Sequence, residues 1–497
     1  MFMKGNLLFL LPLIANIQAS PFELTEAYIE SFSQGLQELK KISEEYEYQE
    51  ENFVAEMYDS KQSLTDAKEY DFIIIGSGPS GSVIANRLSE IPEWKVLLLE
   101  AGAPETKISQ VPSMYHYLQT THYDWRYSTV SQNHSCLGME EHRCSIAAGK
   151  ALGGNTAVND MLYGRGNQRD YDLWADLGLP EWCWNDVLPY FKKIEDAHIS
   201  DFDRKHHNLG IGPKEELEQL HITPVADLRV GKNLKDQVGF IGLNFILNET
   251  SKVHGESEFL MEYLKNGKGP LTSAGIEAVG FLKTDASKEQ AHYPDIELLI
   301  SNNIYNRGHQ IQKSLRVRKE IYDAVWAPLE PAEGFSIQVI LLHPKSTGAL
   351  TLHDSDPLHH PLINTNSLTD LDDRDVESLL AGIKLSLKLS HTDALQKLGI
   401  HLNHNKVPGC EHYEGDNYWK CAIKYLSVNL GQISGTAKMG PVTDKEAVVD
   451  EKLRVYGVHK LRVADASVIP VTISSNLMAP CIMIGEKAAD LIKETWK

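Results

Sequence analysis

Three glycines and one acid near position 80 have the types and spacing that bind a nucleotide. Gly76 permits a tight turn, Gly78 lets backbone N–H groups approach a pyrophosphate, and Gly81 lets a following helix pack closely. Glu100 stands where a carboxylate accepts hydrogen bonds from the ribose hydroxyls of an adenosine. The glycines belong to one continuous loop, Gly76-Ser77-Gly78-Pro79-Ser80-Gly81. These residues predict a dinucleotide site, with NAD and FAD equally compatible.

The elements around this loop are those that the site requires. A buried-strand pattern at 72–75 precedes the glycines, a helical stretch follows them, and a second apolar run at 96–99 ends at Glu100. The alternative is a glycine-rich turn in an ordinary α/β protein. The full strand, helix and acid order favours nucleotide binding over that alternative.

Length and charge limit the remaining possibilities. A chain of 497 residues is long enough for two joined domains or one large α/β body with an inserted lobe. Its formal net charge of −20 argues against nucleic acid and anionic membrane surfaces as partners. After the first residues, no stretch has the length and apolar character of a transmembrane helix.

The first 19 residues have the order of a secretory signal peptide: Lys4, an apolar core at 7–14 and Ala19. A buried N-terminal strand is the alternative. Export favours disulfides, and we expect two local pairs, with Cys183 and Cys481 as buried thiols. The expected pairs are Cys136 with Cys144 and Cys410 with Cys421. The sequons at Asn133 and Asn248 predict glycosylation of an extracellular protein.

Patterning along the chain predicts three parts after one or two amphipathic helices at 20–69. These are a nucleotide domain at 70–255, a sheet-based lobe at 256–430 and a closing part of the nucleotide domain at 431–497. Strands are predicted at 296–300, 336–342, 349–352 and 461–464, and helices at 370–390 and 479–493.

Four ordered motifs resemble those of the glucose-methanol-choline (GMC) oxidoreductases, in particular their secreted insect branch of glucose dehydrogenases and salicyl alcohol oxidases. The first is the nucleotide unit. The others are Gly149-Lys150-Ala151-Leu152-Gly153-Gly154-Asn155-Thr156-Ala157-Val158-Asn159, Gly435-Thr436-Ala437-Lys438-Met439-Gly440-Pro441, and Leu461-Arg462-Val463-Ala464-Asp465-Ala466-Ser467 with Ser475-Asn476-Leu477-Met478-Ala479-Pro480. Their order across residues 70–497 makes the resemblance specific.

The resemblance implies an α/β fold, with an FAD-binding Rossmann-like domain and an α+β substrate-binding lobe. FAD would lie with its pyrophosphate at the glycine loop, Gly153 and Gly154 along the flavin, and its isoalloxazine ring near Asn159 and Asp465. The implied reaction oxidises the CH–OH group of a small alcohol, and aryl alcohols are the first class to test. A base takes the hydroxyl proton, a hydride passes to the flavin, and oxygen or another acceptor reoxidises the flavin.

The catalytic pair implied by the resemblance is incomplete. The family has a His in the third motif and a His or Asn in the fourth, whereas this chain has Gln432 and Asn476. Glutamine has no usable basicity near neutral pH, so we expect a loss of about 10²–10⁴-fold unless another His or water serves as the base. Further departures are Ala147-Ala148 in place of an apolar residue, Pro and Arg, Asn155-Thr156 in place of a Ser pair, and Gln237 in place of a His.

The chain also looks shortened relative to the family. It runs from His207 directly into Gly210-Ile211-Gly212-Pro213, where the family has further strands of the FAD sheet and a second signature. Loss of strands from a parallel sheet exposes ladder hydrogen bonds and apolar faces. We therefore expect an incomplete FAD domain near 207–212.

Three hypotheses follow from this pattern. The first is an FAD-dependent alcohol oxidase or dehydrogenase of impaired activity, with Asn476 orienting the substrate. The second is a catalytically silent secreted paralogue or splice product. The third is a flavoprotein that catalyses a non-redox reaction, as hydroxynitrile lyases of the family do, and Gln432 argues against it as well.

Overall fold

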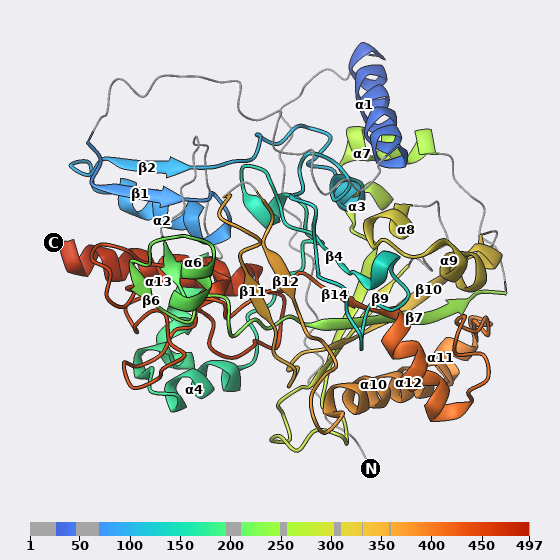
Figure 1. Cartoon of the computed structure of the whole chain (residues 1–497). Coiled ribbons are helices and arrows are strands. Elements are labelled where there is room, and N and C mark those ends of the chain that lie inside the picture. Colours follow the sequence, from blue (N-terminus) through green and yellow to red (C-terminus); the bar gives the residue numbers. More distant parts are fainter. Residues whose placement is uncertain are drawn as a thin grey trace.

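The computed structural model describes residues 26–45, 69–194, 210–248, 256–302, 310–330, 332–356 and 359–496. Figure 1 shows a nucleotide half, which contains β1, β2, α2 and α13, beside a lobe built on a larger sheet. The predicted signal peptide lies outside the described residues. The predicted N-terminal helical segment contributes α1 (Glu26–Glu44), whose Phe32, Leu36 and Leu39 are buried against the loop region around Met114 and Leu118.

The predicted nucleotide unit is confirmed. Strand β1 (Phe72–Ile75) pairs in parallel with β2 (Val96–Leu99), and α2 (Pro79–Ser89) connects them. The C-terminal helix α13 (Met478–Trp496) packs on α2. A Cβ at Gly485 would lie 2.7 Å from the carbonyl oxygen of Ser80, so the two helices touch where that glycine stands. The nucleotide half is therefore built from the two ends of the chain, as expected.

Ion pairs fasten the same contact. Arg87 of α2 donates from Nε and Nη2 to the carboxylate of Glu486 at 2.8–2.9 Å, and Lys193 of α5 (Trp184–Ile194) reaches that carboxylate at 2.7 Å. Glu486 is buried, with 1% of its side chain exposed, so this network lies in the interior.

One face of β1 is bare. Phe72 and Ile74 pack into the core under α13, whereas Ile73 and Ile75 on the other face are 60% and 49% exposed. Within the described residues β1 has one neighbour, β2. A parallel sheet ordinarily has both faces covered and a central first strand. This exposure supports the expected loss of strands, although the deletion itself stays a prediction.

The lobe contains a six-stranded sheet in the order β13-β7-β10-β9-β8, with β14 also paired to β7. Its strands are β7 (Val238–Ile246), β8 (Ile276–Leu282), β9 (Ile296–Ser301), β10 (Gly334–Leu341), β13 (His401–Leu402) and β14 (Ser427–Asn429). The predicted strands at 296–300 and 336–342 are thus present. Strand β7 belongs to this sheet, so the lobe begins before the predicted boundary at residue 255.

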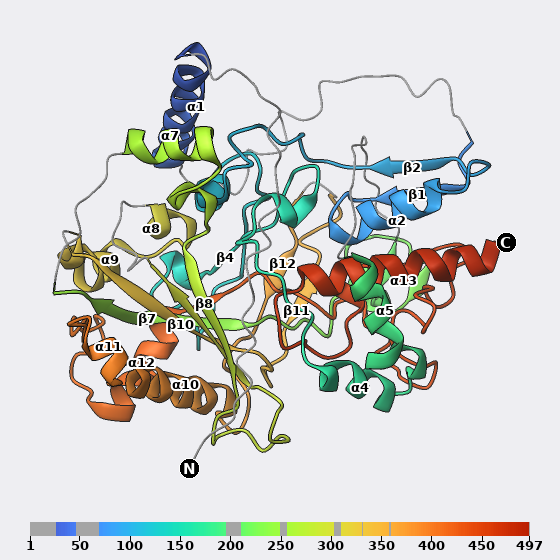
Figure 2. The same cartoon turned by 180° about the vertical axis from the view of Figure 1, so that it is seen from behind.

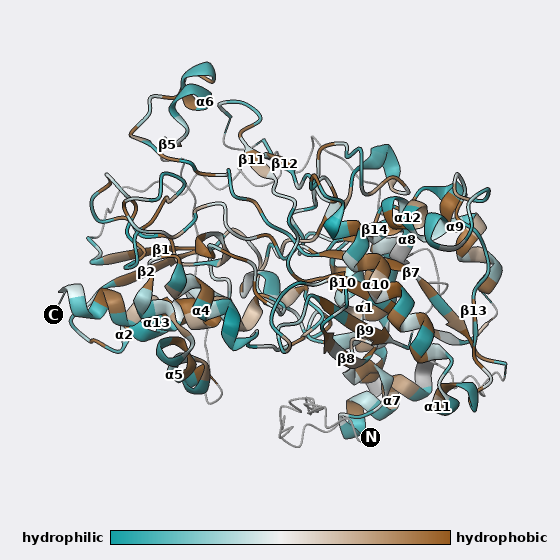
Figure 3. Ribbon diagram, turned by 90° about the horizontal axis from the view of Figure 1, so that it is seen from below, coloured by the Kyte–Doolittle hydropathy of each residue, from teal (hydrophilic) through white to brown (hydrophobic). Residues whose placement is uncertain are grey.

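Two helices cover one face of this sheet, α10 (Arg374–Ser390) and α12 (Gly415–Leu426). A Cβ at Gly382 of α10 would lie 2.5 Å from Val339 Cγ1 and 3.2 Å from Ile296 Cγ2, so these residues point to the helices. Figures 1 and 2 show both helices on one side of the strands, and Figure 3 shows the apolar residues concentrated along the strands. The other face is therefore directed away from the helices.

The remaining elements are short. They include α3 (Tyr115–Leu118), α4 (Gln168–Asp176), α6 (Lys214–Gln219), α7 (Glu256–Asn266), α8 (Gln310–Ser314), α9 (Lys319–Val325), α11 (Asp393–Gln396), and the two-stranded pairs β3 (Tyr127–Ser128) with β4 (Ser145–Ile146), β5 (Ile211–Gly212) with β6 (Ala226–Asp227), and β11 (Ala349–Thr351) with β12 (Leu362–Asn364).

The predicted strand at 461–464 is wrong. Its backbone pairs only with its own neighbourhood, because Val463 N donates to Leu453 O and Val455 N donates to Leu461 O. The segment is a tight local loop whose apolar side chains pack against the α13 core. An apolar run of four residues fits such a loop as well as a strand.

The expected disulfides are both present, Cys136–Cys144 and Cys410–Cys421. Cys481 is a buried thiol as expected, but Cys183 is only half-buried and donates its Sγ hydrogen to Asp186 at 3.0 Å. Asn133 and Asn248 of the two sequons are exposed. No helix of the described residues has the length and hydropathy needed to cross a bilayer.

Candidate functional site

The glycine loop is held by Glu100. The carboxylate accepts hydrogen bonds from the backbone N–H and the hydroxyl of Ser77, both at 2.8 Å, and from Gly102 N at 2.6 Å. Glu100 is 6% exposed, and Ser77 is fully buried. In this structure the acid that was predicted to meet a ribose therefore also fixes the loop that was predicted to meet the pyrophosphate.

The second motif lies directly on this loop. Gly153 N donates to Ser77 Oγ at 3.2 Å, and a Cβ at Gly154, where φ is +58°, would lie 2.8 Å from Gly78 Cα. The two glycine segments, far apart in the sequence, are thus in contact. The closeness explains why glycine stands at 154.

The space in front of α2 fits a pyrophosphate. A Cβ built on Gly78 would meet no protein atom within 4 Å, and Gly78 precedes Pro79 at the first turn of the helix without a side-chain cap. The first N–H groups of a helix without a side-chain cap, together with its dipole, form an anion site. Ser80, which is buried, donates instead to Cys481 O at 2.6 Å and so ties the helix start to α13.

Asn159 and Asp465 lie at the edge of the same region. Asn159 donates from Nδ2 to Met478 Sδ at 3.3 Å, which joins the second motif to the fourth. Asp465 is exposed and caps a short 3₁₀ turn by accepting from Ser467 N at 2.8 Å. Burial, with a contribution from the Asp465 charge, raises the pKa of Cys481 to about 12. The predicted flavin-side residues are therefore grouped near the start of α13.

Gln432 fixes the segment that carries Asn476 by hydrogen bonding. Its Oε1 accepts from Leu477 N at 2.8 Å, and its own backbone N–H donates to Asp236 Oδ1 at 2.8 Å. Gln237, which also stands where a His is expected, holds the same segment, because its Nε2 donates to Ile473 O and Ser475 O at 2.9 and 3.1 Å. The two glutamines that replace expected histidines thus hold the segment on both sides of Asn476.

A buried polar network holds this segment from the other side, and no pattern in the sequence predicts it. Asp170 accepts from Ser474 N and Ser474 Oγ at 2.9 Å and from Tyr293 Oη at 2.8 Å. His343 contacts Thr472 Oγ1 at 3.2 Å and Ser474 Oγ at 2.9 Å. Burial lowers the pKa of His343 to about 3 and raises the pKa of Asp170 to about 6. His343 is thus a neutral structural ring, with both nitrogens engaged, and a poor substitute for the missing base.

A carboxyl group that the sequence did not identify faces the site from the lobe. Glu297 follows Ile296 on β9, so its side chain lies on the sheet face opposite α10. Strand register aligns Glu297 with Ile340 of β10, and Ile340 with Gly239 of β7, two residues after Gln237. Glu297 therefore lies on the same face of the lobe sheet as Gln237.

The environment of Glu297 is unusual for an acid. Its side chain is 1% exposed, and Oε1 has no hydrogen-bond partner. Burial first, and the charge of Asp160 second, raise its pKa to about 8. Because Asp160 follows Asn159 directly, this electrostatic contact places Glu297 near the predicted flavin side. Burial likewise raises the pKa of Asp236 to about 7. Two buried carboxyl groups, Asp236 beside Gln432 and Glu297 on β9, thus have pKa values shifted toward neutral pH, a typical feature of functional sites.

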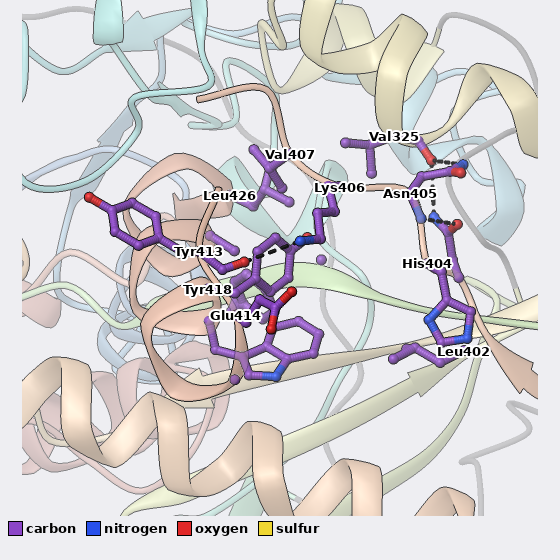
Figure 4. A pocket seen from close by; sticks show the side chains of 16 residues that line it. Val325, Leu402, His404, Asn405, Lys406, Val407, Tyr413, Glu414, Tyr418 and Leu426 are labelled. Carbon is purple, nitrogen blue, oxygen red and sulfur yellow. Dashed lines mark hydrogen bonds between the residues drawn. The ribbon is translucent and has the colours of Figure 1, made fainter. Parts of the chain in front are cut away.

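A separate pocket of about 270 Å³ lies between β7 and α12, on the helix-covered side of the sheet. Figure 4 shows Val407, Tyr418 and Leu426 among its walls, with Lys406 donating to a carbonyl of Tyr413. None of the predicted site residues lines it. We place the chemistry at the Gln432 segment, because the acids with shifted pKa values and the glycine loop are grouped on that side.

Sequence comparison identifies the family. The profile of GMC oxidoreductases matches residues 70–241 and 344–485. Glucose dehydrogenase [FAD, quinone] of Drosophila pseudoobscura pseudoobscura is 31% identical over 561 residues, covering 86% of this chain and 87% of the relative. The chain belongs to the GMC oxidoreductase family. FAD is its cofactor, and the glycine loop, Glu100 and the open space at Gly78 fit that group.

Other GMC relatives are similar over nearly their whole length. Ecdysone oxidase of Spodoptera littoralis is 26% identical, covering 89% of this chain and 94% of the relative. Among solved structures, formate oxidase of Aspergillus oryzae RIB40 has a TM-score of 0.69 at 22% identity, covering 87% of this chain and 99% of that chain. A fungal aryl-alcohol oxidase has a TM-score of 0.64 at 19% identity, covering 86% and 99%. The structural likenesses establish the fold, as predicted.

The alignment lengths bear on the expected shortening. The alignment with glucose dehydrogenase spans 561 positions, whereas 86% of 497 residues is about 427, so about 130 aligned positions have no counterpart in this GMC chain. This difference agrees with an internal deletion, without fixing its place.

Proposed function

We propose that the chain is a secreted FAD-dependent oxidoreductase that oxidises the CH–OH group of a small alcohol. The observation that carries the proposal is the meeting of three sequence-distant motifs at one place, where Gly154 contacts Gly78 and Asn159 donates to Met478. Relatives named glucose dehydrogenase and ecdysone oxidase, and the fold of an aryl-alcohol oxidase, support alcohols as the substrate class. Oxygen or another acceptor would complete the cycle.

The bound flavin would supply the acceptor for the hydride of the alcohol carbon. The protein has to orient the hydroxyl group and take its proton. Asn476 would orient the hydroxyl by hydrogen bonding, and the hydrogen bonds of Gln432 to Leu477 N and of Gln237 to Ser475 O, on either side of it, support this role. Gln432 itself takes no proton, and its amide oxygen is already an acceptor for Leu477 N.

We assign the proton to Glu297. It faces the site, it is buried, and its Oε1 lacks a partner. A carboxyl group with a pKa of about 8 matches the working pH of a general base better than an ordinary Glu does. Asp236 is the competing carboxyl group, but its Oδ1 already accepts from the backbone of Gln432. Glu297 would therefore replace the imidazole expected at position 432.

A catalytically silent secreted paralogue is the second candidate. Two observations favour it: the engaged amide oxygen of Gln432, and the bare face of β1 at Ile73 and Ile75. The first experiment is the visible absorption spectrum of the protein purified from a secretory host. A flavin spectrum that bleaches anaerobically with an alcohol supports the oxidoreductase. A flavin spectrum that no alcohol bleaches supports the silent paralogue, and a folded, colourless protein refutes the FAD-dependent function.

A further inference from the structure

The hairpin of β11 and β12 carries a cluster of metal-ligating side chains that includes none of the residues of the site described above. The segment between the two strands has the sequence Leu352-His353-Asp354-Ser355-Asp356-Pro357-Leu358-His359-His360-Pro361, of which the structure describes 352–356 and 359–361. The hairpin is anchored between the halves of the molecule, where Leu350 N donates to Gly231 O and Val130 N donates to Ile363 O, both at 2.8 Å. Figure 1 shows β11 and β12 near its centre.

Two imidazole rings of this turn point at one carboxylate oxygen. Asp354 Oδ2 lies 3.0 Å from Nδ1 of His353 and 2.6 Å from Nδ1 of His359. The three ligand atoms all lie within 4.8 Å of one another. The rings meet edge to face, with centroids 5.7 Å apart, so both nitrogens converge without stacking.

The carboxylate is oriented for this role by the backbone. Asp354 Oδ1 accepts from Asp356 N at 2.8 Å, which leaves Oδ2 directed at the two rings. An aspartate side chain is ordinarily ionised at neutral pH, so Asp354 offers an anionic oxygen ligand. A backbone donor that fixes a ligating carboxylate is a usual part of metal sites.

We propose that His353, Asp354 and His359 bind one divalent zinc-class metal ion through Nδ1, Oδ2 and Nδ1, with water in the remaining positions. Ligands about 2.0–2.2 Å from a common ion in tetrahedral geometry lie about 3.3–3.6 Å apart. The two nitrogen to oxygen separations, 3.0 and 2.6 Å, are hydrogen-bond distances, so the exposed rings would move outward by about 1 Å or less to admit the ion. Two imidazoles and one carboxylate select zinc or a similar transition metal over calcium or magnesium. The side chains are 55%, 37% and 56% exposed, so an ion reaches them from solvent.

The ion would act as a clamp on the hairpin. It replaces the hydrogen-bonded protons between the rings and the carboxylate, and it joins residues on both sides of the turn. An ion that binds the folded chain and not the unfolded chain stabilises the fold, by an amount that grows with the logarithm of the ratio of metal concentration to Kd. The site is thus structural in its expected effect, and it does not rest on the flavin chemistry.

The test uses the full secreted chain without a polyhistidine tag, dialysed against EDTA and then freed of EDTA. Calorimetric titration with zinc chloride should give one saturable site, magnesium chloride should give none, and zinc should raise the thermal unfolding temperature. His353→Gln and His359→Gln should each weaken zinc binding by at least about tenfold. His360→Gln, next to the cluster with its ring against Tyr127, is the matched control and should retain binding.

Thermal unfolding in EDTA shows that each variant is folded, since these exposed side chains contribute little to stability. Zinc binding that is absent, that is only weak and multiple, or that survives His353→Gln and His359→Gln unchanged overturns the proposal. Binding lost in His360→Gln as much as in His359→Gln would overturn the assigned ligand set.

Discussion

The variants Glu297→Gln and Gln432→His test which side chain takes the proton of the alcohol. Both changes are close to isosteric with what they replace, and each alters basicity rather than volume. Glu297→Gln removes the buried acid and keeps an amide in its place. Gln432→His restores the ring that the GMC family has at this position.

The magnitudes separate the two roles. General base catalysis is worth about 10²–10⁴-fold, or about 3–5 kcal/mol at 1.36 kcal/mol per tenfold. Gln432→His gives up the hydrogen bond from Leu477 N to Oε1, which costs about 1 kcal/mol. If Glu297 is the base, Glu297→Gln therefore lowers the rate of flavin reduction by about 10²–10⁴-fold. Gln432→His then adds at most about tenfold to the parent chain but restores the Glu297→Gln variant, because the imidazole supplies the missing base.

The assay is anaerobic stopped-flow reduction of the flavin at 450 nm with an alcohol panel, for the parent, both single variants and the double variant. Flavin content and thermal unfolding are measured on each preparation, so that loss of cofactor is not read as loss of a base. Asp236→Asn serves as the comparison, since the asparagine side chain still accepts a hydrogen bond from Gln432 N but does not titrate.

Three outcomes would refute the assignment of the proton to Glu297. Equal rates for the parent and Glu297→Gln would show that the buried carboxyl group takes no part. A large gain from Gln432→His in the parent, with no change from Glu297→Gln, would show that the parent chain simply lacks a base. A loss confined to Asp236→Asn would transfer the role to that carboxyl group.

Three further changes have definite expected outcomes. Gly78→Ala should leave the unfolding free energy unchanged, because its Cβ meets only the cofactor space. It should weaken FAD binding at least tenfold, as measured by fluorescence titration. Gly154→Ala should also destabilise the fold by about 1–2 kcal/mol, because φ at this position is +58°. Arg87→Met should cost about 3 kcal/mol in urea unfolding, because it leaves Glu486 buried with one partner fewer. The folded pKa of Glu297 is raised, so its contribution to stability is present below pH 4.5 and is lost as the pH rises to about 8. Because Glu297→Gln removes this loss, its unfolding free energy relative to the parent should rise by on the order of 4 kcal/mol from pH 4.5 to pH 8, as measured by urea unfolding. The same difference between variant and parent at both pH values would contradict the prediction.

The sequence predicted those features that depend on short-range pattern. The glycine loop, its strand and helix, and the acid at 100 are encoded within thirty residues, and the two disulfides close short loops. The lobe strands followed from apolar runs of ordinary length. The segment at 461–464 failed by the same criterion, because its apolar side chains serve a loop against α13 rather than a sheet.

The features that the sequence missed depend on pairings between distant segments. Glu297 reads as one acid in an apolar strand, and only the register of β9 with β10 and of β10 with β7 sets the face on which it lies. A shift of one residue would turn it toward α10. The burial of His343 against Thr472 and Ser474 likewise follows from tertiary packing, and no local pattern distinguishes this His from the other nineteen.

The bare face of β1 and the cofactor site are separate properties of this chain. The groups proposed to meet a pyrophosphate come from the glycine loop, the start of α2 and the Gly154 segment, and these are fastened to α13 through Ser80 and Arg87. Ile73 and Ile75 point to the other side of the strand, where a covering layer is expected. Exposed apolar residues on a short strand that is paired along one edge favour association with other chains. Incomplete sheet formation therefore bears first on solubility, and the loss of the family's His bears on turnover, so neither defect by itself removes the flavin.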